Sequence, residues 1–176
     1  MLRLIAMIAL TLASISPLQG AETDVWKPIR FMLGEWKGTS HGDPGEGTVQ
    51  RSYTLVLGGK FIQEKNVSTY PPQERNKSGE RHEHLSLFGF DKDRKLITFR
   101  QFHQESFVIT YVMNLNASSA TKVVFDSEQL ENVPSSWKAR ETYEILSPNE
   151  FVETFAIAEA GKTFETYSQN HFRRVP

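Results

Sequence analysis

The sequence predicts an all-β fold, a single antiparallel up-and-down barrel of about ten strands with a short N-terminal helix. Alternating segments recur at a spacing of roughly 10–12 residues, which is typical of antiparallel sheets. Two short motifs lie at opposite ends: Gly34-Glu35-Trp36 opens the first expected strand, and Arg173-Arg174 closes the last. Because a closed barrel brings these strands together, we expect Arg173 to cover the indole of Trp36 as a closure contact, worth roughly 0.5–2 kcal/mol.

The expected elements follow in order along the chain. Residues 24–33 suit a short helix or turn, because Pro28 limits its length. Strands are then expected at residues 35–40, 47–57, 60–70, 81–91, 95–104, 107–115, 122–130, 139–146, 150–158 and 163–173. Gly58-Gly59 predicts a tight hairpin. The longer connection over residues 131–138 carries Trp137, and it is able to form a flap over one mouth of the barrel.

The N-terminal residues 1–20 predict a secretory signal peptide rather than a part of the fold. Arg3 precedes an apolar run that Pro17 ends, and Gly20 supplies a small residue at the expected cleavage point. The run is too short to span about 30 Å of hydrocarbon comfortably, so no membrane insertion is expected. The barrel domain would then be residues 21–176, located in the periplasm or secreted.

Composition excludes several classes of function. The chain carries 20 basic and 21 acidic side chains, a near-neutral balance that predicts no attraction to nucleic acid. The lack of cysteine excludes disulfides, thiolate metal sites and cysteine nucleophiles. Neither a nucleophile-elbow motif nor a glycine-rich phosphate loop occurs. We therefore assume no catalysis, and both a monomer and a homodimer fit the sequence.

Polar side chains inside alternating strands are the candidates for a ligand-binding interior. An arginine within a barrel can hold a ligand carboxylate bidentately, and tyrosine hydroxyls can add hydrogen bonds. The alternative is that the arginines face outward and pair with glutamates. The expected ligand-binding residues are Tyr53, Gln63, Arg100, Tyr111 and Arg140.

Two histidines share a face of the fourth expected strand. His82 and His84 flank Glu83, and residues two apart in a strand point the same way. Both imidazoles can meet one metal ion if a neighbouring strand supplies a third ligand, such as His103. The other interpretation is a solvated polar face on the exterior of the barrel, and no metal site is assigned.

Four short blocks span nearly the whole expected domain in a fixed order. They are Leu33-Gly34-Glu35-Trp36-Lys37-Gly38, Leu57-Gly58-Gly59-Lys60-Phe61-Ile62, Phe88-Gly89-Phe90-Asp91-Lys92-Asp93 and Asn170-His171-Phe172-Arg173-Arg174. Together they resemble a bacterial family of lipocalin-like domains of unknown function in the calycin superfamily. More distantly, they are similar to nitrobindins, ten-stranded barrels that bind haem iron through a histidine near the last strand. That resemblance implies His171 as an axial ligand and haem as a possible cofactor.

These observations predict an exported lipocalin-like barrel that binds a small, largely apolar or amphipathic molecule in its interior. One alternative, implied by the resemblance, is a nitrobindin-like haem protein that acts on nitrogen oxides. A second alternative is a packed barrel that serves as an interaction module.

Overall fold

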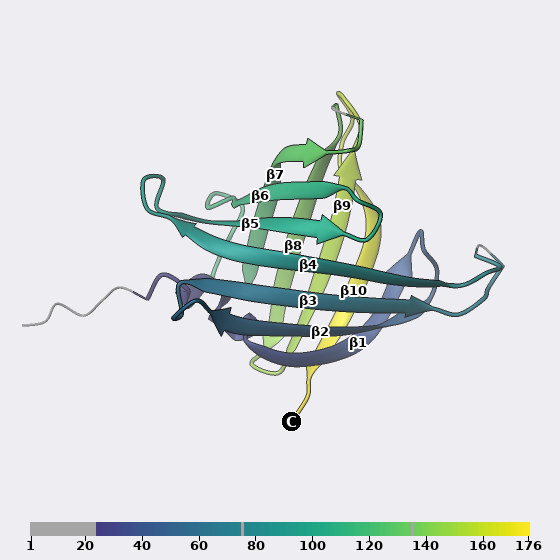
Figure 1. The fold of residues 1–176 in the computed structure, drawn as a ribbon, viewed down its shortest axis with the longest axis horizontal. Helices are drawn as coiled ribbons and strands as arrows, with labels where there is room; N and C mark the ends of the chain where they lie inside the picture. The colour runs from purple at the N-terminus through teal and green to yellow at the C-terminus, as the bar shows by residue number, and fades with distance from the viewer. Residues whose placement is uncertain (1–23, 75, 135) are drawn as a thin grey trace, which may run out of the picture.

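The computed structural model describes residues 24–74, 76–134 and 136–176, so the expected signal peptide over residues 1–20 lies outside the described residues. The chain forms a closed antiparallel barrel in which each strand pairs with the next, and the first strand pairs with the last (Figure 1). This confirms the predicted ten-stranded up-and-down barrel. Within the described residues, no helix is long and apolar enough to cross a membrane.

The observed elements lie within two residues of the predicted strand bounds. The expected N-terminal helix is only a short 3-10 helix, η1 (Lys27–Met32), with a proline in its first turn. The strands are β1 (Gly34–Gly42), β2 (Gly47–Val56), β3 (Phe61–Tyr70), β4 (Glu80–Asp91), β5 (Leu96–His103), β6 (Val108–Met113), β7 (Lys122–Glu131), β8 (Lys138–Ser147), β9 (Glu150–Ala158) and β10 (Glu165–Arg174). In Figure 1, β2 to β6 cross in front of β7 to β10.

Trp36 and Arg174 close the seam between β1 and β10. They are opposite each other in the register, and the Arg174 guanidinium carbon lies 4.2 Å from the centre of the Trp36 ring. Arg174 also donates hydrogen bonds to the carbonyl oxygens of Leu33, at 2.6 Å, and Phe31, at 2.8 Å. The indole N–H of Trp36 donates to the carbonyl oxygen of Met32 at 2.6 Å. These contacts tie η1 across one end of the barrel.

The prediction that Arg173 covers the indole is therefore wrong by one residue. The Arg173 side chain is 75% exposed and lies 3.2 Å from the Glu150 carboxylate. The physical reason is the register of β1 against β10, which runs without a shift from Gly42–Ser168 to Trp36–Arg174 and pairs Arg173 with the exposed Lys37. In this part of β10 the even-numbered residues face the interior, so the inner position belongs to Arg174.

Two glycines in β1 allow the last strand to approach closely. A Cβ atom at Gly38 would overlap the backbone carbonyl of His171 in β10. Gly34 has a φ of +118°, and a Cβ atom there would lie 2.7 Å from Nη1 of Arg174. The glycines on either side of Trp36 are thus required by the closure of the barrel.

Aromatic rings fill the half of the barrel next to η1. Phe99 stacks between Phe88 and Tyr111, with ring centroids 4.4 Å apart in both pairs. The largest fully buried rings are Trp36, Tyr53, Phe88, Phe99, Tyr111, Phe125, Tyr143, Phe151 and Phe172. Their burial supplies most of the apolar stabilisation and leaves only the other half of the barrel available for a ligand.

The closure contacts predict a difference between two adjacent arginines. We expect Arg174→Ala to lower the free energy of unfolding by about 2–4 kcal/mol, because it removes a cation–π contact and charge-assisted hydrogen bonds to the carbonyl oxygens of Phe31, Leu33 and Pro148. Arg173→Ala is the matched control and should change it by less than about 0.5 kcal/mol, as for other exposed side chains. Urea denaturation followed by circular dichroism measures both values. Equal losses in the two variants would contradict this account of the seam.

Candidate functional site

A cavity of about 360 Å³ occupies the half of the barrel away from η1. One part of its wall is apolar and largely aromatic. The side chains that form this part include Phe107, Ile109, Leu130, Trp137, Phe155 and Ile157. Trp137 brings the connection between β7 and β8 into the wall.

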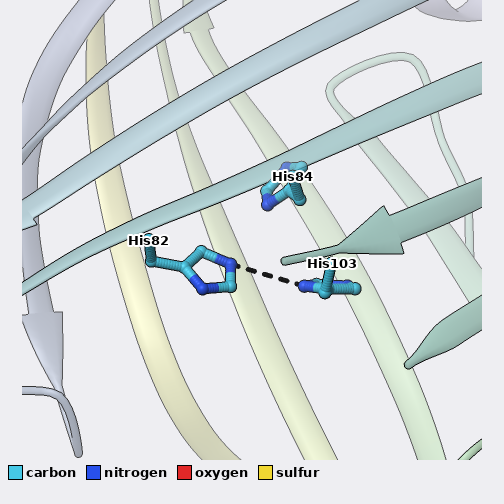
Figure 2. A group of neighbouring side chains, drawn as sticks. All are labelled: His82, His84 and His103. Carbon is cyan, nitrogen blue, oxygen red and sulfur yellow. Dashed lines mark hydrogen bonds between the residues drawn. The ribbon is translucent and has the colours of Figure 1, made fainter. Parts of the chain in front are cut away.

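Three histidines face one another on the polar part of the wall (Figure 2). His82 and His84 project from the inner side of β4, and the register places His84 opposite His103 of β5. Nε2 of His82 lies 3.4 Å from Nδ1 of His103. One ring nitrogen from each residue lies within 4.8 Å of those of the other two. The interpretation of these residues as an exterior polar face is therefore wrong.

The outer nitrogen of each histidine is held by a side-chain oxygen. The three pairs are His82 Nδ1 with Glu105 Oε1 at 3.0 Å, His84 Nε2 with Glu64 Oε1 at 3.3 Å, and His103 Nε2 with Gln101 Oε1 at 3.1 Å. These contacts fix the ring orientations and leave one further nitrogen on each ring. Those of His82 and His103, Nε2 and Nδ1, lie within hydrogen-bond distance of each other.

The surroundings of His103 favour its neutral form. Burial, together with the neighbouring His84 and His82, lowers the pKa of His103 to about 2. The ring of Phe107 stacks on it, with centroids 3.9 Å apart. At neutral pH the His103 imidazole is therefore uncharged, with one nitrogen lone pair available.

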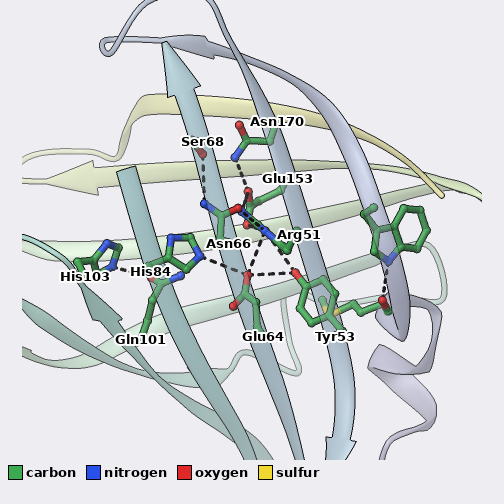
Figure 3. A network of polar contacts seen from close by, with 12 residues as sticks. Arg51, Tyr53, Glu64, Asn66, Ser68, His84, Gln101, His103, Glu153 and Asn170 are labelled. Carbon is green, nitrogen blue, oxygen red and sulfur yellow. Dashed lines mark hydrogen bonds and ion pairs between the residues drawn. The ribbon is translucent and has the colours of Figure 1, made fainter. Parts of the chain in front are cut away.

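Arg51 forms the floor of the cavity, where it meets the aromatic half (Figure 3). Its Nε lies 3.1 Å from Oε1 of Glu64, and its side chain is 1% exposed. It donates to both oxygens of Glu153, from Nη2 at 2.9 Å and from Nη1 at a shorter distance. It also donates to Oδ1 of Asn66 at 2.9 Å and to the Tyr53 hydroxyl at 3.2 Å. Every nitrogen of the guanidinium therefore has a partner.

The pKa values of two carboxyl groups near the floor are shifted in opposite directions. Burial raises the pKa of Glu64, but the charge of Arg51 and the contact with His84 outweigh it and lower this pKa to about 2. For Glu141, burial and the negative charge of Glu153 raise the pKa well above its ordinary value. Oε2 of Glu141 has no hydrogen-bond partner among the described residues. The floor thus combines an ionised carboxylate with a carboxyl group that favours its protonated form.

The two tyrosines predicted to bind a ligand lie in the aromatic half of the barrel. Tyr53 is buried and contacts Arg51 from below the floor, at 3.2 Å. Tyr111 is fully buried and stacks on Phe99. Both are interior residues, but they support the cavity rather than line it.

The interior position predicted for Gln63, Arg100 and Arg140 is wrong. All three lie on the outer face, because the residues on either side of each take the inward positions. In β3, for example, Ile62 and Glu64 are both fully buried. A strand of fixed period cannot also turn the residue between them inward.

The two outward arginines pair with acidic side chains on the surface. Arg100 lies 2.5 Å from Glu131, and Arg140 lies 2.6 Å from Asp126. The alternative in which the arginines face outward is therefore correct for both, but the pairing with a glutamate that it expected holds only for Arg100. The interior arginine is Arg51, which shares its phase with the buried Val49.

His171 also lies outside the barrel. Its side chain is 39% exposed, and Nε2 is 2.7 Å from Oε1 of Glu150. Its neighbours Asn170 and Phe172 are the buried residues of this part of β10. The axial-ligand position implied for His171 is therefore contradicted by the direction of its side chain.

Comparisons with known proteins support the fold and nothing finer. Neither the family models nor the curated proteins give a match to this chain. Among solved structures, the chain is similar to the crystal structure of Rv2717c from M. tuberculosis. The TM-score is 0.62 and the identity 9%, over 87% of this chain and 98% of that chain. At this identity the likeness is one of fold alone.

The raised pKa of Glu141 predicts that replacing its carboxyl group by an amide increases the stability of the protein in a pH-dependent way. Because the folded state holds the proton of Glu141 more tightly than the unfolded chain, this residue costs stability as pH rises above its ordinary pKa of 4.5. We expect Glu141→Gln to stabilise the protein at pH 7 by on the order of 1 kcal/mol, and to have almost no effect at pH 4.

Urea denaturation at the two pH values, with EDTA present, measures the effect. Glu144→Gln makes the same change on the exposed face of β8 and should give no such pH dependence. A Glu141→Gln variant that is less stable than the parent protein at pH 7 would contradict the assignment.

Proposed function

We propose that this protein is a lipocalin-like binding barrel of the calycin type that holds a small amphipathic molecule in its cavity, without catalysis. The observation that carries the proposal is the division of one cavity into an apolar wall and a polar floor. Its volume of about 360 Å³ falls within the range of roughly 300–1,000 Å³ that ligand pockets occupy. The sequence blocks that resemble lipocalin-like domains support the same function, and export of the protein remains part of this proposal.

The floor favours a ligand whose polar end donates hydrogen bonds. Four of the five N–H groups of Arg51 already bond neighbouring side chains, and its side chain is only 1% exposed, so it offers little to a ligand carboxylate. The unpartnered buried oxygens at the floor include Oε2 of Glu141 and Oδ1 of Asn170. A carboxylate ligand would add negative charge beside Glu64 and Glu153, which already outnumber the single guanidinium of Arg51, whereas an alcohol, amide or amine can donate to the oxygen of Asn170. The proposed ligand is therefore a neutral or cationic amphiphile.

The alternatives receive less support. A barrel that is packed throughout does not agree with the cavity. A haem protein would need another axial ligand than His171, whose imidazole lies on the outer face. Binding of an amphiphile is therefore the function that the cavity supports best.

Tryptophan fluorescence tests the proposal, because one of the three tryptophans reports on the cavity. Trp26 and Trp36 are buried near the closed end, whereas Trp137 lines the cavity. We expect octylamine and 1-octanol, titrated in the presence of EDTA, to change the emission at saturation. Octanoate should bind at least about tenfold more weakly, since its carboxylate adds negative charge beside the buried Glu64 and Glu153.

Two single variants make this test specific. Trp137→Phe should remove the ligand-dependent change, and Trp26→Phe, the matched control at the closed end, should keep it. No saturable change with either favoured probe would overturn the proposed function. Tighter binding of octanoate than of octylamine would overturn the proposed ligand class.

Haemin provides a separate check on the alternative implied by the nitrobindin resemblance. Because His171 lies outside the barrel, we expect the parent protein and His171→Ala to give the same absorption spectrum with haemin. A Soret band that the parent protein shows and the variant loses would restore His171 as a haem ligand.

A further inference from the structure

The histidine cluster on the cavity wall has the geometry of a metal centre. We propose that His82, His84 and His103 bind one divalent ion of the zinc type. Four-coordinate zinc with Zn–N bonds of about 2.0–2.1 Å places neighbouring ligand nitrogens roughly 3.3–3.4 Å apart. The distance of 3.4 Å between Nε2 of His82 and Nδ1 of His103 already matches this spacing. The His84 ring supplies the third nitrogen within 4.8 Å of both.

The hydrogen bonds at the outer nitrogens support a metal ion between the rings. A histidine that binds a metal almost always uses its other ring nitrogen to bond a carboxylate, a carbonyl or water. Here the oxygens of Glu105, Glu64 and Gln101 hold one nitrogen of each ring. By elimination, the inner nitrogens are Nε2 of His82, Nδ1 of His84 and Nδ1 of His103.

The surrounding fold holds these rings in place before any ion arrives. His84 is anchored by Glu64, which is itself bound by the buried Arg51. The Phe107 ring stacks on His103 from the other side. Ligands carried by paired strands and fixed by a second layer of contacts are the arrangement that a metal site needs.

The chemistry of the donors indicates the class of ion. Three imidazole nitrogens suit zinc, copper, nickel or cobalt, whereas magnesium and calcium prefer oxygen ligands. Among the described residues that line the cavity, Arg51 is the only arginine or lysine, and it is neutralised by two carboxylates. Glu80 and Glu105 add negative charge at the polar part of the wall. Three protein ligands leave a fourth position that faces the cavity, open to water or to a ligand group.

A second group of donors competes for one of the histidines. Glu80, His82 and Glu105 also bring one donor atom each to within 4.8 Å of one another. It shares His82 with the first group but uses neither His84 nor His103. Variants of these two residues therefore distinguish the two sites.

Metal titration of the EDTA-stripped protein tests the proposal. We expect isothermal titration calorimetry to give one zinc ion per chain, and Co²⁺ to show the intense visible absorption of a four-coordinate site. His84→Gln and His103→Gln should each weaken zinc binding by at least about 100-fold. Glu105→Gln, which leaves the three rings in place but removes a carboxylate behind His82, should weaken it about tenfold.

The chain supplies a matched control in its two remaining histidines. The sequence has five histidines in all, and the double variant His41→Ala/His171→Ala keeps only the three of the cluster. This variant should bind zinc like the parent protein. Near-ultraviolet circular dichroism of each metal-free variant checks that it is folded. His82→Gln, whose side chain is 20% exposed in the parent protein, provides a ligand variant at a more accessible position.

Three results would overturn the proposal. The first is no saturable zinc binding by the parent protein, and the second is loss of binding in the His41/His171 double variant. The third is loss of binding in His82→Gln while His84→Gln and His103→Gln still bind zinc. The last result would assign the ion to Glu80, His82 and Glu105 instead. Because the amphiphile titrations contain EDTA, failure of the metal site leaves the proposed ligand function untouched, and failure of the ligand function leaves the metal site untouched.

Discussion

The buried contact of Arg51 with Glu64 and Glu153 positions both the floor of the cavity and the histidine cluster. Arg51 and Glu64 come from the neighbouring strands β2 and β3, whereas Glu153 comes from β9, so the contact links this pair of strands to β9 across the interior. A buried ion pair contributes little net stability compared with apolar packing, but removing one partner leaves a costly unpaired charge. The contact therefore acts mainly as a positional constraint. It separates the aromatic half from the cavity and fixes the Glu64 carboxylate that bonds His84.

The same cavity contains both of the proposed sites. The histidine cluster lies on its polar wall, Glu141 and Asn170 lie at its floor, and Trp137 lies on its apolar side. An ion held by three imidazoles would keep one coordination position directed into this space. A ligand with an amine or alcohol group is able to occupy that position, so the two proposals describe chemically compatible occupants of one chamber.

The sequence predicts the barrel fold clearly, but it does not predict as clearly which polar residues face the interior. Strand spacing, turn residues and the position of Trp36 were sufficient for the fold, because these signals repeat along the chain. A polar strand such as β3 gives no hydrophobic contrast between its faces, so the inward positions of Glu64 and Asn66 could not be distinguished from solvated ones. In β10, the register against β1 places Arg173 and His171 opposite the outward residues Lys37 and Thr39, and the pair Arg173-Arg174 alone does not show which arginine faces the interior.

The seam between β1 and β10 also has a consequence for how the chain reaches this fold. Every other strand pair joins neighbours in the sequence, whereas Trp36 must meet Arg174 across nearly the whole described chain. Long-range pairings of this kind slow folding, because the entropy of closing the loop is lost before the contact is gained. Until the seam forms, the sheet has two edges with unpaired backbone groups, which are templates for pairing with another chain. The rate at which the first and last strands meet therefore sets how long aggregation competes with folding.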